Sequence, residues 1–130
     1  MTEGIEILKR AVGRDVCHVA VNVLFYGAET EGVLASVSLI LGDDAEFSLG
    51  CAGNGGVYVR RLRQAYGDAP GFTTRRHRIE GVCGELRAAS STGNVMRLLI
   101  VERELVLANE DDELLIKVDG EALPYQILTR

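Results

Sequence analysis

The sequence predicts a mostly β fold of the α+β class. We expect about eight short antiparallel strands in a sandwich, a roll or a barrel-like sheet, with one N-terminal helix packed on it. Through most of the chain, apolar residues alternate with other residues at a period of two, and glycine-rich or acidic turns interrupt them at close spacing. Only the first dozen residues show the period of a helix. The length of 130 residues corresponds to one domain, so residues 1–130 are expected to form a single unit.

The predicted helix covers the first dozen residues. Ile5, Leu8 and Val12 recur at helical spacing and define one apolar face. Thr2 is suited to cap its first turn, and Gly13 is suited to end it. A helix this short needs a surface to cover, so we expect it to lie on the sheet.

The first predicted strand shows the clearest alternation in the chain. Residues 19, 21, 23 and 25 are apolar and share one face, and Cys17 has the same parity. This pattern places Cys17 in the core with them and turns His18 and Asn22 to the opposite face.

The remaining strands follow at short intervals. Residues 37–59 and 98–118 each show the pattern of a three-stranded meander. A single helical turn is predicted at 62–66, where the alternation stops. The further predicted strands are 33–41, 45–51, the residues after 57, a bent strand at 79–89, 95–101, 105–107, 114–118 and 125–128.

Charge is unevenly distributed along the chain. The net charge is −5, yet residues 60–78 contain six arginines and one aspartate, while the stretches before and after carry −5 each. Two aromatic residues, Tyr66 and Phe72, lie within this basic segment. The candidate binding residues are therefore Arg60, Arg61, Arg63, Arg75, Arg76, His77 and Arg78.

Three interpretations of this arginine segment remain open. The arginines pair with acidic groups of the chain itself or of a second copy, they contact another protein, or they bind nucleic acid. Nucleic acid is the least favoured partner because the chain as a whole is acidic, and nucleic-acid-binding domains are usually basic.

The sequence contains none of the short motifs that mark common enzymes. It has no G-x-S-x-G nucleophile turn, no phosphate-binding glycine loop and no C-x-x-C pair, so we predict no catalytic residue, no metal site and no cofactor. Cys17, Cys51 and Cys83 are odd in number and far apart, which is typical of reduced thiols. With no export signal and no apolar stretch long enough for a membrane span, we expect a cytoplasmic location and no membrane partner.

These observations favour a small, non-enzymatic bacterial binding protein, an inhibitor or immunity-type partner of another protein. In size, charge and strand rhythm the chain resembles many small bacterial proteins, some of which are immunity proteins that neutralise a toxin. Two alternatives stay open. One is a small β-rich enzyme or ligand-binding barrel with His18 and Asn22 in its pocket, and the other is a nucleic-acid-binding protein that uses segment 60–78.

Overall fold

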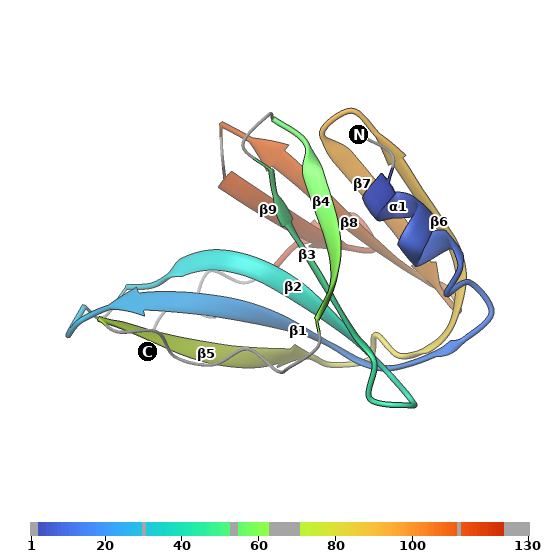
Figure 1. The fold of residues 1–130 in the computed structure, drawn as a ribbon, viewed down its shortest axis with the longest axis horizontal. Coiled ribbons are helices and arrows are strands. Elements are labelled where there is room, and N and C mark those ends of the chain that lie inside the picture. Colours follow the sequence, from blue (N-terminus) through green and yellow to red (C-terminus); the bar gives the residue numbers. More distant parts are fainter. Residues whose placement is uncertain (1–2, 30, 53–54, 63–70, 112, 124–130) are drawn as a thin grey trace.

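The chain forms a mostly β structure with one N-terminal helix packed on it, as predicted (Figure 1). The computed structural model describes residues 3–29, 31–52, 55–62, 71–111 and 113–123. Within them the elements are α1 (Glu3–Lys9), β1 (Asp15–Tyr26), β2 (Val33–Leu41), β3 (Glu46–Cys51), β4 (Val57–Leu62), β5 (Phe72–Ile79), β6 (Gly84–Thr92), β7 (Val95–Ile100), β8 (Arg103–Glu110), β9 (Glu113–Val118) and β10 (Glu121–Ala122).

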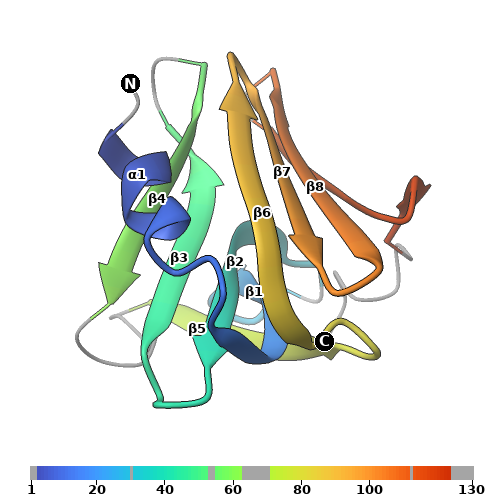
Figure 2. The same ribbon diagram turned by 90° about the vertical axis from the view of Figure 1, so that its right-hand side faces the viewer.

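All strands belong to one antiparallel sheet that folds over on itself. Its order is β10-β9-β8-β7-β6-β1-β2-β3-β4, and β5 also pairs with β1. We call β5, β1, β2, β3 and β4 the first layer, and β6 to β10 the second layer. Figure 2 shows strands of the two layers facing each other. In the described part of the chain the end strands β4 and β10 do not pair with each other, so the sheet does not close into a barrel.

The long strand β1 joins the two layers. Its first two residues, Asp15 and Val16, pair with β6, whereas the stretch from Val19 to Tyr26 pairs with β5. Both β5 and β6 therefore lie along one edge of β1, and β2 lies along the other. The bent strand predicted at 79–89 is divided between β5 and β6, because residues 80–83 turn between them.

The core lies between the layers, and the predicted parity of β1 is confirmed. Val19, Val21, Val23 and Phe25 are all 0% exposed. Their neighbours on β2 and β3 extend the same inner face. From the second layer, buried apolar side chains complete this core: Leu86, Met96, Leu98, Ile100, Leu105, Leu107, Leu114 and Ile116.

The prediction that Cys17 lies in the core is wrong. The pairing between β1 and β2 shifts between Val16 and His18, which marks an irregularity of the β-bulge type. As a result Val16 is buried with 1% exposure, and Cys17 is exposed. A single extra residue in one strand thus moves the side chain that simple alternation assigned to the core.

The helix α1 ends earlier than predicted and covers the side where the two layers separate. Ile5 and Leu8 are buried, but Val12 lies beyond the helix and is 39% exposed. The helix contacts β4 of the first layer and β6 of the second. A Cβ atom on Gly4 would lie 2.9 Å from the backbone nitrogen of Val59, so glycine is needed where the helix meets β4.

The two predicted meanders are present, one in each layer. Strands β2, β3 and β4 form the first, and β7, β8 and β9 form the second. The predicted strand 125–128 and all of the predicted turn 62–66 except Leu62, which ends β4, lie outside the described residues. No helix among the described residues is long and apolar enough to cross a membrane.

Candidate functional site

The predicted arginine segment is divided between two strands. Arg60 and Arg61 belong to β4, whereas Arg75 and Arg78 belong to β5. Strands β1, β2 and β3 lie between β5 and β4 in the first layer. Four interstrand spacings of about 4.8 Å separate the two groups by roughly 19 Å along the sheet. Arg63 lies outside the described residues.

Arg76 lies on the outer face of the first layer and connects three other strands. Its Nε donates to Oδ1 of Asn22 on β1 at 3.0 Å, and a terminal nitrogen donates to Oγ of Ser38 on β2 at 3.1 Å. The same nitrogen forms an ion pair with Oε2 of Glu46 on β3 at 2.7 Å. The side chains of Arg76 and Glu46 are 32% and 10% exposed. One arginine of the segment is therefore paired internally, which is the first of the three interpretations.

Asn22 is a structural residue of this network. Its Nδ2 donates to Oγ of Ser36 and of Ser38, both at 2.9 Å, while its Oδ1 accepts from Arg76. Asn22, Ser36 and Ser38 are 0% exposed, so these hydrogen bonds satisfy polar groups that water does not reach. His18 lies on the same face of β1, half-buried, and is not part of the network. The structure thus joins Asn22 to Arg76 and leaves His18 apart.

Two buried polar atoms have no hydrogen-bond partner among the described residues. They are Oγ of Ser48 on β3 and Nε2 of His77 on β5. His77 pairs with Val21 in the register and therefore faces inwards, unlike its neighbours Arg76 and Arg78. His77 therefore shares its face of β5 with Arg75, which pairs with Val23, but unlike Arg75 it is half-buried.

Four arginines of the segment are exposed and form no ion pair with a described residue. They are Arg60, Arg61, Arg75 and Arg78. Arg60 lies over the ring of Tyr58, 5.5 Å from the ring centre, and this contact holds its cation at the surface. The Tyr58 ring in turn covers Gly50, where a Cβ atom would lie 2.7 Å from it.

Other arginines of the chain do find carboxylates. The chain carries 19 acidic and 14 basic residues, so carboxylates are not scarce. Among the described residues outside the segment, four of the five arginines form ion pairs, namely Arg14 with Asp43, Arg87 with Glu85, Arg97 with Glu104 and Arg103 with Asp119, whereas Arg10 on the surface forms none. Within the described residues, the four exposed arginines of the segment therefore have no carboxylate partner, although the chain has acidic groups in excess.

Two of these pairs fix turns. The backbone N–H of Ala45 donates to Asp43, and this hydrogen bond, together with Arg14, lowers the pKa of the Asp43 carboxyl below its ordinary value. In the same way the N–H of Glu104 and the Arg103 guanidinium lower the pKa of Asp119. Each of these carboxylates therefore stabilises the turn in which it lies.

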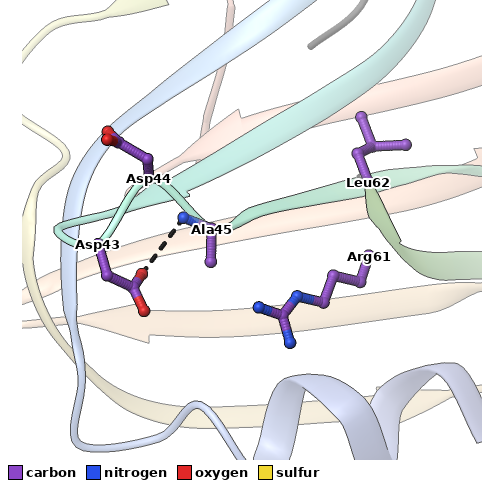
Figure 3. Close-up of a pocket in the computed structure, with 5 residues that line it drawn as sticks. All are labelled: Asp43, Asp44, Ala45, Arg61 and Leu62. Atoms are coloured by element: carbon purple, nitrogen blue, oxygen red, sulfur yellow. Dashed lines mark hydrogen bonds between the residues drawn. The ribbon is translucent and has the colours of Figure 1, made fainter. Parts of the chain in front are cut away.

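A hollow of about 520 Å³ lies beside the β2–β3 turn (Figure 3). It is lined by Asp43, Asp44, Ala45, Arg61 and Leu62. Arg61 extends its guanidinium towards the turn, whereas the Asp44 carboxylate points away from that guanidinium (Figure 3). The lining combines two carboxylates with one guanidinium and contains neither a thiol nor an imidazole, so its chemistry is that of charge recognition.

The cysteines are separate from one another. Cys17 and Cys83 are exposed, and Cys51 is half-buried. In the described ranges no group of three or more His, Cys, Asp or Glu side chains is placed to hold a metal ion.

Comparison with known proteins gives no relative. No family model matches the chain, and no curated protein or solved structure matches it either.

Sequence reasoning missed Glu46 and Ser38 as partners of the arginine segment. Both belong to an outward-facing set of polar residues on adjacent strands, and that alternation was visible. Their contact with Arg76 depends on β5 pairing with β1, a long-range pairing that no local pattern specifies.

Proposed function

We propose that this chain is a non-enzymatic binding protein that recognises another protein, in the manner of an inhibitor or an immunity-type partner. The single observation that carries the proposal is a set of four exposed arginines that have no carboxylate partner in the described part of the chain: Arg60, Arg61, Arg75 and Arg78. In a chain of net charge −5, cations left unpaired on regular strands favour a partner that supplies the carboxylates.

The chemistry of arginine supports this proposal. The guanidinium is planar and permanently charged, and it binds carboxylates through two parallel hydrogen bonds. Arginine is enriched in protein interfaces, where lysine and the acidic residues are depleted. Because Arg75 and Arg78 extend from a paired strand, their backbone is already ordered before a partner arrives, and this lowers the entropic cost of binding.

Nucleic acid is less well supported as the partner. A phosphate backbone is best followed by a continuous basic surface, whereas the two arginine groups lie roughly 19 Å apart along the sheet. Arg76, which is central in the sequence segment, is neutralised by Glu46. The exposed thiols Cys17 and Cys83 support the bacterial cytoplasm as the proposed location, since reducing compartments keep exposed thiols reduced.

Selection from a displayed library of short random peptides tests the proposal. We expect the chain to enrich peptides rich in Asp and Glu, because the unpaired arginines attract carboxylates. Two double variants identify the edge that binds, namely Arg60→Ser with Arg61→Ser on β4 and Arg75→Ser with Arg78→Ser on β5. At least one of them should lose the enrichment.

The matched control is Arg87→Ser with Arg97→Ser, which removes two exposed arginines of the second layer that already have carboxylate partners. This variant should keep the enrichment. Selection of peptides without acidic residues, or enrichment that survives both β4 and β5 variants, would contradict the proposal. Micromolar oligonucleotide binding that weakens with salt and needs these arginines would replace it with the nucleic-acid interpretation.

A further inference from the structure

The two outer strands of the first layer differ in how their edges are covered. At β4, the helix α1 packs against the strand, and Gly4 approaches the backbone of Val59. At β5, the only strand partner within the described residues is β1. From Arg75 to Ile79 the strand runs in regular register with β1, so the N–H and C=O groups directed away from β1 form an edge that can accept another strand.

The side chains of this edge select what can pair with it. Arg75 and Arg78 are exposed and have no carboxylate among the described residues, while Arg76 is already paired with Glu46. Residues 75 and 78 are three positions apart, so they extend from opposite faces of the strand. A carboxylate on each face of an added strand would meet one free arginine.

We propose that the Arg75–Ile79 edge of β5 binds an extended acidic segment of a partner protein as an added strand. This inference rests on the proposed function and names the partner's chemistry: an extended segment with two acidic residues three positions apart. Main-chain hydrogen bonds would provide affinity, and the two arginines would provide specificity. Arg76 would stay engaged with Asn22, Ser38 and Glu46, holding β5 in place for the added strand.

A second copy of this chain does not fit the same edge. Antiparallel pairing of β5 with β5 would bring arginines close to arginines, and like charges directly across a strand pair are destabilising. Charged side chains on an edge strand also serve elsewhere to prevent aggregation. If the arginines have only that protective role, the edge binds no strand at all, so binding measurements separate the two roles.

The test uses three synthetic peptides as long as β5, with the whole protein and fluorescence anisotropy. The first peptide alternates in β-forming residues and carries two glutamates three positions apart. The second has the same sequence with N-methylated backbone amides, which removes its ability to pair as a strand. The third replaces both glutamates with lysines. We expect saturable binding of the first peptide only, weakened by added salt.

Protein variants assign the contact to β5. Arg75→Ser with Arg78→Ser should weaken binding of the first peptide about tenfold, as expected for the loss of two exposed ion pairs. Arg87→Ser with Arg97→Ser should leave it unchanged. Circular dichroism of each variant checks that the fold is retained, and Arg75→Lys with Arg78→Lys, which keeps the charge, should retain part of the affinity.

The outcomes separate this inference from the proposed function. Equal binding of the N-methylated peptide, still dependent on Arg75 and Arg78, would overturn strand addition and leave carboxylate recognition intact. Binding of no acidic peptide, combined with self-association of the Arg75→Ser/Arg78→Ser variant, would show that the arginines only protect the edge, and it would overturn the inference. Loss of acidic selection in the library experiment as well would overturn both.

Discussion

A double-mutant cycle on Arg76 and Glu46 tests the ion pair, because the structure predicts whether each substitution raises or lowers the free energy of unfolding. Replacing Arg76 with Met removes three hydrogen bonds and leaves the Glu46 carboxylate, 10% exposed, without its cation. Replacing Glu46 with Leu leaves the Arg76 guanidinium, 32% exposed, without its anion. Replacing both residues removes both charges from the outer face of the first layer.

The expected loss of stability lies between the values for buried and for exposed ion pairs. Breaking a fully buried pair costs about 3–5 kcal/mol, whereas an exposed pair contributes about 0–1 kcal/mol. Since Glu46 is nearly buried and the Arg76 side chain is about one third exposed, we expect Arg76→Met to lower the free energy of unfolding by about 2–3 kcal/mol, between these two classes. Glu46→Leu should cost slightly less because the arginine reaches water more easily. With 130 residues and about 2.1 cal/mol/K of unfolding entropy per residue, the Arg76→Met loss lowers Tm by roughly 7–11 °C.

The double variant is the informative one. Apolar side chains of similar volume replace buried ion pairs at little cost, so Arg76→Met with Glu46→Leu should be more stable than Arg76→Met alone. Urea unfolding of the four proteins, with equal m values, measures the coupling. Additive losses, with the double variant the least stable, would show that the two charges do not interact and would refute the network as described.

Three further predictions concern the core, a hydrogen bond between the layers and a turn. Phe25→Ala should cost about 3–5 kcal/mol in urea unfolding because the ring is 0% exposed, whereas Tyr26→Ala, at a position 45% exposed, should cost far less. Asn109→Ala should lower the free energy of unfolding by about 1–3 kcal/mol, because its Nδ2 donates to backbone carbonyls of the β3–β4 turn at 2.8 and 3.3 Å. Asn94→Ala, at an exposed position, should lower it less. Equal losses of stability in the two variants would contradict the bridging role of Asn109. Because the pKa of Asp119 is lowered in the folded state, its carboxylate stabilises the fold at pH values above the ordinary aspartate pKa of about 3.9, and this contribution is lost as pH falls through the folded-state pKa. The Asp119→Asn variant should therefore lose less stability on acidification than the parent chain. The same dependence of stability on pH in both proteins would contradict this.

Local patterns were enough to predict most of the strands and the inner face of β1, but they did not predict β5 (Phe72–Ile79), of which only Ile79 lay in a predicted strand. Val19, Val21, Val23 and Phe25 are buried together because alternation fixes which face a side chain takes. The same rule failed at Cys17, because a bulge adds one residue to the strand. No local pattern in the sequence indicated this bulge.

The candidate site was harder to predict because it depends on long-range pairing. Sequence proximity joined the arginines of 60–63 and 75–78 into one segment, but β5 pairs with β1 instead of lying beside β4. That pairing brings Arg76 to Asn22 and Glu46, which are 54 and 30 positions away in the chain. Net charge along the sequence could show an excess of arginine, but it could not show which arginines are neutralised.

The most direct test of carboxylate recognition at β5 is to map the contact on the isotope-labelled chain by NMR. The acidic peptide with two glutamates is titrated in, and backbone amide shifts are followed for each residue. We predict that the largest changes fall on Arg75 to Ile79 and on the neighbouring residues of β1, and that they vanish in the Arg75→Ser/Arg78→Ser variant. Shifts centred on β4, on the acidic β8–β9 turn or on the second layer, or no saturable shift at all, would contradict the account.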